Sequence, residues 1–276
     1  MPTPGLTLLG FMSQDQAINY LRYACQVEDA SDEALVAEWN AARAAISAGP
    51  ENAGNPLIRD IPTDQLGHIE SIKTGPWQAS ISGDWDFKMV EISQLIAFQF
   101  SILTEKTNGH CADFTNPPSI SQLLDVCLPL VPESENLSVS HLPQSIMLRG
   151  KNLNLRTVQS GMLGPNILGV NFGFSVPFVH VVRLNGRCYL HNGFHRVFGA
   201  ALAGAREVPC VFRDVLDAEA AGIRSDQTTF GLDLLESENP PTMHHFITDQ
   251  AHPVQLKVMS RVINVSWSDY VVPDDY

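Results

Sequence analysis

Two Asn-Gly pairs within one twenty-residue stretch constrain the fold of this chain more than any other feature. The stretch, residues 181–200, reads VVRLNGRCYLHNGFHRVFGA. Asn185-Gly186 is the pair that a two-residue type I′ turn favours, because both central positions need positive φ. The β-branched and aromatic segment PFVHVVRL precedes this pair, and RCYLH follows it. The sequence therefore predicts a β-hairpin over residues 177–191.

The second pair, Asn192-Gly193, follows this hairpin directly, and a helix is predicted after it. FHRVFGAALAGA places apolar residues at helical spacing and ends at Gly204, and the next segment, EVPCVFRDV, has the composition of a strand. A sharp turn at Gly193 exposes the first amide groups of the helix. These groups lack intrahelical partners and lie at the positive end of the helix dipole.

These features predict an anion site at the start of that helix. Gly193 has no Cβ that would keep a ligand from the backbone. His195 and Arg196 add donors and positive charge, and arginine binds phosphate or carboxylate through paired hydrogen bonds. A structural role is the alternative, in which His195 is an interior histidine and Arg196 pairs with Asp214 or Glu207.

The rest of the chain gives weaker local predictions. Helices are predicted in SQDQAINYLRYACQ (13–26) and ALVAEWNAARAAISAG (34–49), and a linker over residues 49–62. Strands are predicted in WQASISG (77–83), FKMVEISQLIAFQFSI (87–102) and RVINVSW (261–267). Loops are predicted in KTNGHCADFTNPPSI (106–120) and MHHF (243–246). A short helix or strand is predicted in SISQLLDVCLPLV (119–131). Residues 142–174 show no clean period.

The composition narrows the range of functions. The chain has 30 acidic and 17 basic residues and a net charge of −13, which disfavours binding to nucleic acids and to anionic membranes. Its five cysteines form no CxxC pair, so structural zinc and a disulfide framework both fit poorly. No basic leader precedes an apolar stretch at the start, and no window approaches ~18 uninterrupted apolar residues. A soluble, cytoplasmic protein is expected.

The corner Asn192-Gly193-Phe194-His195-Arg196, followed by AGAREVPCVF, resembles the ParB/sulfiredoxin superfamily. Its members share a strand–glycine turn–helix motif of the form (D/N)GxHR or GExR. Upstream, MVEISQLIAFQ (89–99) is similar to the family's first strand and its L-x-x-x-Q ending. The resemblance covers roughly residues 87–215 and includes a long unmatched middle. In that family the motif loop holds the phosphates of a nucleotide, which implies phosphate binding by Gly193, His195 and Arg196.

Phe194 departs from the family's catalytic patterns. Sulfiredoxins place a cysteine directly before the His-Arg pair, and a phenylalanine cannot form the thiol-derived intermediates of that chemistry. Chromosome-partitioning members place an acidic residue after the glycine for CTP hydrolysis. Their helix-turn-helix DNA-binding domain has no visible counterpart in this chain. The resemblance therefore implies the family's more general role in nucleotide binding, with small-molecule kinase activity in some members.

The first functional hypothesis is a protein that binds a nucleotide or phosphometabolite and, if it is an enzyme, acts as a phosphotransferase or hydrolase on a small molecule. The expected cofactor is ATP or another nucleotide with Mg²⁺. The phosphate-binding candidates are Asn192, Gly193, His195 and Arg196, with Arg156 supplied from an opposite wall. The catalytic candidates are His195 and Glu91. The sequence does not identify the general base, for which Asp214 and Glu207 are further candidates.

Two alternatives remain open on sequence grounds. One is a regulatory or binding module that keeps the anion pocket without catalysis. The other is a metal-dependent enzyme that uses His191 and His195 together with His244, His245 and His252. The His191 and His195 pair is predicted to divide between a strand and a helix, so the one-face argument for an i, i+4 zinc pair fails. No residue is therefore assigned to a metal.

The predicted fold class is α+β (mixed α/β), with a ParB/sulfiredoxin-like core. The expected segments are an N-terminal helical segment (1–50), a linker with the first strand or strands (51–85), the core with a long insertion (86–216) and a C-terminal extension (217–276). The expected partner is a small-molecule ligand, without nucleic acid or membrane, and a homo-oligomer is left open.

Overall fold

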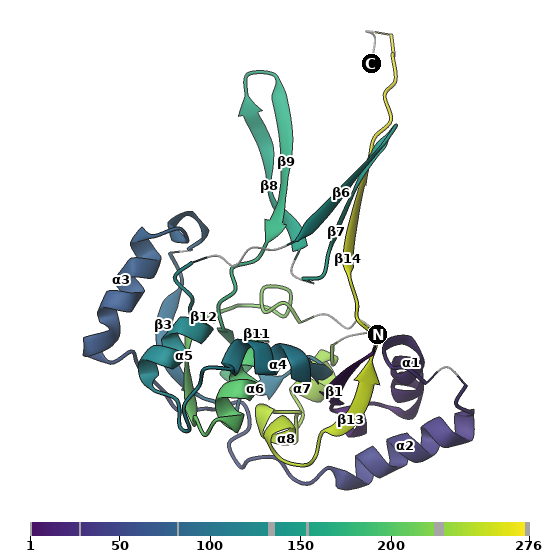
Figure 1. The fold of residues 1–276 in the computed structure, drawn as a ribbon, viewed down its shortest axis with the longest axis vertical. Helices are drawn as coiled ribbons and strands as arrows, with labels where there is room; N and C mark the ends of the chain where they lie inside the picture. The colour runs from purple at the N-terminus through teal and green to yellow at the C-terminus, as the bar shows by residue number, and fades with distance from the viewer. Residues whose placement is uncertain are drawn as a thin grey trace. The chain divides into compact units, whose positions relative to one another are not determined.

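The computed structural model describes residues 2–27, 29–81, 83–131, 136–152, 155–223 and 229–273 (Figure 1). They fall into two compact units. The first comprises Met1–Val131 and Pro177–Lys257, and the second comprises Pro132–Val176 and Val258–Tyr276. Helices occur together with parallel and antiparallel strands, so the fold is mixed α+β, as predicted. The four segments expected from the sequence do not coincide with these two units.

A six-stranded mixed sheet forms the centre of the first unit. Its order is β2-β3-β12-β10-β11-β4. The strands are β2 (Ile58–Asp60), β3 (Asp86–Glu91), β4 (Ile96–Ala97), β10 (His180–Leu184), β11 (Arg187–Asn192) and β12 (Glu207–Asp214). β10 runs parallel to β12 and antiparallel to β11, and β4 runs parallel to β11.

The predicted hairpin is confirmed as β10 and β11. Asn185 and Gly186 both have positive φ, 51° and 79°, as a type I′ turn requires. Leu184 pairs with Arg187 across this turn. Apolar side chains of both strands are fully buried in the core. The Asn-Gly pair therefore sets the register of the strand that leads to the predicted anion site.

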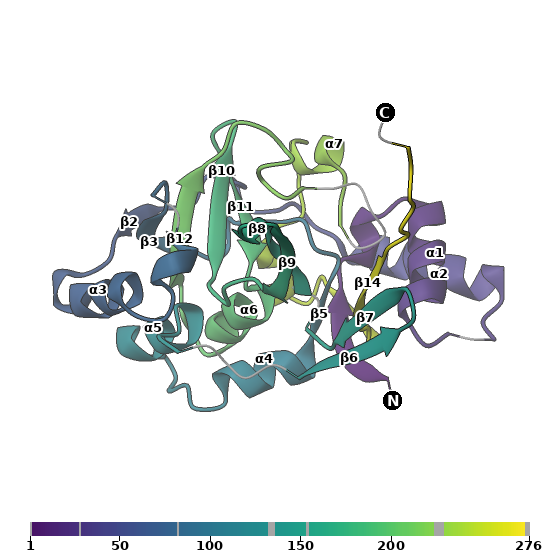
Figure 2. The same cartoon turned by 90° about the horizontal axis from the view of Figure 1, so that it is seen from above.

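Two helices, α5 (Ile120–Cys127) and α6 (Phe194–Leu202), pack against β12 of this sheet and against each other, and α4 (Thr104–Cys111) packs against α6 (Figure 2). The predicted helix after the second Asn-Gly pair is α6, and the chain turns at Gly204 with φ of +92°. The segment predicted as a short helix or strand, SISQLLDVCLPLV, contains helix α5. This helix begins with a capping box between Ser119 and Gln122. α6 is buried along most of its length because β12, α4, α5 and α8 surround it.

A second sheet in the first unit has the order β13-β1-β5, from β1 (Thr3–Thr7), β5 (Ser101–Leu103) and β13 (His252–Leu256). Beside it lie α1 (Gln14–Ala24) and α2 (Asp32–Ala45), which confirm the two predicted N-terminal helices. Ser13 and Ser31 cap them by accepting hydrogen bonds from Gln16 N and Ala34 N. The remaining helical elements are η1 (Leu9–Phe11), η2 (Thr63–Gln65), α3 (Leu66–Thr74), η3 (Gln78–Ser80), α7 (Leu232–Leu235) and α8 (Met243–Ile247).

Three local predictions are wrong. The segment predicted as a strand at 77–83 holds the 3-10 helix η3, because the Trp77 indole donates to Pro129 O and its ring packs edge-on against Phe178. The region predicted as a loop over 106–120 is helical in its first six residues, which belong to α4, and this helix packs against α6 despite its weak periodicity. MHHF belongs to α8, where Thr242 and His245 form a capping box. The strand predicted over 87–102 is divided into β3, β4 and β5 by turns.

The second unit consists of β-ribbons. β6 (Leu137–Leu142), β7 (Ser145–Gly150) and β14 (Arg261–Ser266) form a sheet of order β14-β7-β6, and β14 confirms the strand predicted at RVINVSW. β8 (Leu155–Gly164) and β9 (Ile167–Phe174) form a separate antiparallel hairpin. Residues 142–174, which gave no clean period, thus belong to two hairpins whose β8–β9 register shifts twice. No helix among the described residues has the length and apolar character to cross a bilayer.

The contact between α4 and α6 gives a matched test of this packing. A Cβ added at Gly199 would overlap the Cys111 side chain and lie 3.1 Å from Thr107 Cγ2. We expect Gly199→Ala to lower the free energy of unfolding by about 1–3 kcal/mol, measured in urea. Gly109→Ala is the control, because no atom lies within 4 Å of its added Cβ and alanine favours a helix. Equal effects of the two substitutions would contradict the close packing at Gly199.

Candidate anion-binding corner

The corner between β11 and α6 is built on a left-handed glycine. Gly193 is the N-cap of α6 with φ of +96°, and Val197 N donates to its carbonyl as the first helical bond. A Cβ on Gly193 would lie 2.7 Å from Val179 Cγ2 and 3.1 Å from Val179 Cα. Sequence reasoning assigned the missing Cβ to ligand access. In the structure, the backbone conformation and the approach of Val179 already require glycine at this position.

Asn192 and Arg196 tie the corner to the segment that leads into β10. Asn192 Nδ2 donates to Phe178 O at 3.0 Å. The Arg196 guanidinium donates to Pro177 O, and the residue is only 8% exposed. The two acidic partners that the structural alternative named for Arg196 pair elsewhere. Asp214 binds Arg183 at 2.6 Å, and Glu207 binds Arg59 at 2.7 Å.

His195 has a defined and mainly structural role. Its Nε2 accepts a hydrogen bond from Leu103 N at 3.0 Å. Burial, together with the nearby Lys106, His110 and Arg196, lowers the pKa of His195 to about 3. The imidazole is therefore neutral near pH 7, with the lone pair on Nε2 and the proton on Nδ1. His195 does not supply the positive charge that sequence reasoning assigned to it.

The positive charge near the start of α6 comes partly from a second helix. Lys106 and His110 lie on α4, close enough to His195 to influence its pKa, and Lys106 is exposed. Together with Arg196, they surround the corner with basic groups in a chain whose net charge is −13. Sequence reasoning missed Lys106 and His110, because it placed them in a loop with no relation to α6. A helical pattern in TEKTNGHC would have been the necessary signal, and that segment has few apolar residues.

Glu91 is not brought into this corner. Glu91 ends β3, which β12 and β10 separate from β11 in the sheet. Its carboxylate accepts from Leu57 N and Ser93 Oγ, both at 3.3 Å. It lines a shallow hollow of about 400 Å³ together with Asn52, Asn55, Pro56, Leu57 and Gln94. Arg156 lies on β8 in the second unit, whose placement relative to α6 the structure does not define.

The histidines of the metal hypothesis are engaged in separate contacts. His191 Nδ1 donates to Ala221 O at 2.8 Å, and His245 Nδ1 bonds Thr242 at 3.0 Å. His252 Nε2 lies 3.0 Å from Glu38 Oε1. Within the described ranges, no three His, Cys, Asp or Glu side chains converge as a metal site would require. The structure therefore does not assemble the set that this hypothesis needed.

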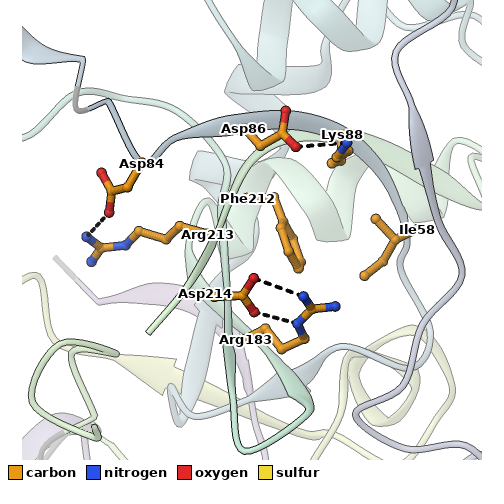
Figure 3. Close-up of a pocket in the computed structure, with 8 residues that line it drawn as sticks. All are labelled: Ile58, Asp84, Asp86, Lys88, Arg183, Phe212, Arg213 and Asp214. Atoms are coloured by element: carbon orange, nitrogen blue, oxygen red, sulfur yellow. Dashed lines mark hydrogen bonds and ion pairs between the residues drawn. The ribbon is translucent and has the colours of Figure 1, made fainter. Parts of the chain in front are cut away.

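A second concave surface lies at the opposite end of β10 from Asn192 (Figure 3). This pocket has a volume of about 370 Å³ and is lined by Ile58, Asp84, Asp86, Lys88, Arg183, Phe212, Arg213 and Asp214. Arg183 stacks over the Phe212 ring at 5.3 Å and makes a two-point ion pair with Asp214. Lys88 bonds Asp60 and Asp86, both at 2.8 Å. A ligand here would have to displace these ion pairs.

The chain was compared with protein-family models, with curated proteins and with solved structures, and none of them matches it.

Replacement of His195 tests the contact with Leu103. His195→Ala leaves the Leu103 N–H without its acceptor, and we expect a loss of about 1–3 kcal/mol of unfolding free energy in urea. His195→Gln places an amide oxygen near the same donor and should lose less. If the two variants are equally unstable, the loss of packing rather than of the hydrogen bond explains the effect.

The lowered pKa of His195 also predicts the effect of pH on stability. The unfolded chain takes up a proton on this residue below its ordinary pKa of 6.5, whereas the folded chain does so only near 3. The contribution of His195 to stability is thus complete above pH 6.5 and is lost as the pH falls toward 3, with a slope of at most about 1.4 kcal/mol per pH unit. His195→Gln lacks this contribution, so its stability should approach that of the wild type between pH 7 and 4. A stability difference that does not change with pH would contradict the buried, neutral histidine.

Proposed function

We propose that this protein binds a phosphate-bearing small molecule, a nucleotide or a phosphorylated metabolite, at the corner formed by residues 192–196. One observation carries the proposal. The left-handed Gly193 turn begins α6, and the basic side chains of Arg196, Lys106 and His110 lie close enough to its first turn to influence the pKa of His195. Helix N-terminal amides and basic side chains favour the same ligand, an anion with several acceptor oxygens.

The order of elements supports the same proposal. Along the chain, strand β11, the glycine turn, α6 and strand β12 follow one another, which agrees with the order that the ParB/sulfiredoxin resemblance implies. β4, from the segment similar to the family's first motif, pairs with β11 beside the corner. Leu103, four residues beyond Gln99, then bonds His195. The two segments that carry the resemblance therefore meet at one place.

The geometry favours binding over catalysis. His195 accepts the Leu103 N–H through the nitrogen that a general base would use. Glu91 lies on β3, and two strands, β12 and β10, separate β3 from β11. Phe194 occupies the position of the family's reactive residue, and it is buried with its ring edge-on to Phe98. The proposal is thus a nucleotide- or phosphometabolite-binding domain. If the ligand is a nucleotide, Mg²⁺ would be bound mainly through its phosphates.

Thermal unfolding tests the proposal directly. The panel is ATP, ADP, CTP and GTP, each with and without Mg²⁺, together with ribose 5-phosphate and inorganic phosphate. A ligand at ~100 times its dissociation constant adds about 2.7 kcal/mol to stability, which is a shift of several degrees in Tm. Lys106→Glu reverses an exposed charge beside the corner, and we expect it to weaken binding by about tenfold.

Lys73→Glu is the matched control, because Lys73 is an exposed lysine on α3 with no part in the corner. It changes the net charge equally and should leave the shift unchanged. Equal weakening by both variants would indicate general electrostatics and contradict a site at α6. The absence of a shift with every ligand, from a folded sample, would contradict the proposal itself.

A further inference from the structure

The hollow that contains Glu91 has no part in the proposed function. It has a volume of about 400 Å³ and is formed by the turn that precedes β2 and the turn that follows β3, both in the first unit. The six residues that line it are Asn52, Asn55, Pro56, Leu57, Glu91 and Gln94. They include no lysine, arginine or histidine. The hollow therefore offers a ligand one carboxylate and several amides, without a cation.

Backbone hydrogen bonds hold the walls of this hollow in place. Gly54 N donates to Gln94 O at 2.7 Å, which joins the two turns. Cys188 N donates to Gly54 O, also at 2.7 Å, and attaches the first turn to β11. Asn55 N donates to Asn52 O at 2.8 Å within that turn. A surface that is already ordered in this way loses little conformational entropy when a ligand binds.

Glu91 lies next to a second carboxylate. In the register of β3 and β12, it is directly opposite Glu207. Arg59 makes its ion pair with Glu207, with the guanidinium Nε at 2.7 Å from the carboxylate. The donors to the Glu91 carboxylate are neutral, namely Leu57 N and Ser93 Oγ. Because like charges directly opposite each other destabilise a sheet, a second cation beside Glu91 would stabilise this pair of strands.

The Glu91 carboxylate keeps acceptor capacity on both oxygens. Oε2 accepts from Leu57 N and Oε1 accepts from Ser93 Oγ, each at the long distance of 3.3 Å. A carboxylate oxygen has two lone pairs, so each of these oxygens can accept one further hydrogen bond. A guanidinium group binds a carboxylate through two parallel N–H···O bonds, one to each oxygen. The bonding of Glu91 therefore leaves room for this two-point contact.

The other lining residues suit the rest of such a ligand. Gln94 Oε1 is buried and accepts no hydrogen bond from the described residues of the chain. A guanidinium has five N–H donors, so donors remain for Gln94 and for the exposed Asn52 and Asn55 after two have bound Glu91. Leu57 is 61% exposed and offers apolar surface to an aliphatic stem.

We propose that this hollow binds a guanidinium group, supplied by free arginine or by an arginine side chain of another protein. Glu91 repels phosphates and carboxylates, and the net charge of −13 attracts cations to the chain. A hard metal ion prefers several carboxylate ligands, and Glu91 is the one carboxylate among the six lining residues. The inference is independent of the proposed anion site, because β12 and β10 lie between β3 and β11 in the sheet.

A nuclear magnetic resonance titration of the full chain tests the site with four probes. N-acetyl-arginine amide should shift the Leu57 amide resonance and saturate, because Leu57 N donates to Glu91. N-acetyl-citrulline amide has the same shape without the charge and should bind at least tenfold more weakly. N-acetyl-lysine amide cannot make the two-point contact and should bind at least threefold more weakly. Tighter binding of free arginine than of the blocked form would identify an amino-acid ligand, and the reverse would identify a protein side chain.

Three variants locate the binding. Glu91→Gln keeps an acceptor oxygen but loses the charge, so it should weaken binding at least tenfold. It should not lower Tm, because it also removes the repulsion from Glu207. Asn55→Asp adds a carboxylate to the lining and should tighten binding severalfold. Glu51→Gln is the control, because Glu51 is an exposed residue of the same turn that does not line the hollow, and it should leave the affinity unchanged.

Three results would overturn the proposal. One is the absence of a saturable shift with both arginine probes throughout the millimolar range. Another is binding of the citrulline or lysine probe as tight as that of N-acetyl-arginine amide. The third is an affinity of Glu91→Gln equal to that of the wild type, which would place the ligand elsewhere on the chain.

Discussion

The hydrogen bond from Leu103 N to His195 Nε2 joins the two sheets of the first unit, and the candidate site depends on it. Leu103 ends β5 in the β13-β1-β5 sheet, and His195 lies in the first turn of α6 beside the six-stranded sheet. Leu103 is also the N-cap of α4, so this bond joins the start of α4 to the first turn of α6, and the packing of Gly199 against Cys111 and Thr107 holds the two helices together further along. These contacts bring the basic side chains of α4 to the start of α6. A buried amide has a strong requirement for an acceptor, so the contact is costly to remove.

Because of this bond, His195 and its neighbours have different roles at the corner: His195 accepts a hydrogen bond, and other residues carry the positive charge. A histidine that accepts a buried amide proton must stay neutral, because protonation of Nε2 would remove its lone pair. The positive charge that attracts an anion therefore has to come from Arg196, which is held by Pro177 O, and from α4. Gly193 is subject to a similar double requirement, since Val179 excludes a Cβ and the turn needs a positive φ. The structural roles and the proposed ligand-binding role thus fall on the same few residues.

The sequence predicted those parts of the fold that local chemistry determines. Asn185-Gly186 predicted the hairpin, and helical spacing after Gly193 predicted α6, because turn geometry and periodicity act over a few residues. The partner of His195 could not be found in this way, since Leu103 lies 92 positions earlier in the chain. The sequence also gave no sign of α4, whose helix depends on packing against α6 more than on its own propensity. The candidate site is thus visible in the sequence as a motif, whereas its charge and protonation state emerge only from tertiary contacts.

The two units differ in how much apolar surface they bury. The first unit buries a continuous core that runs from the N-terminal helices through both of its sheets. Among the described residues of the second unit, the buried hydrophobic side chains are Leu148, Leu155 and Val176. Burial therefore offsets less of the conformational entropy lost when the strands of the second unit form. The corner at α6 belongs to the unit with the larger core, so its geometry is held by the more stable part of the chain.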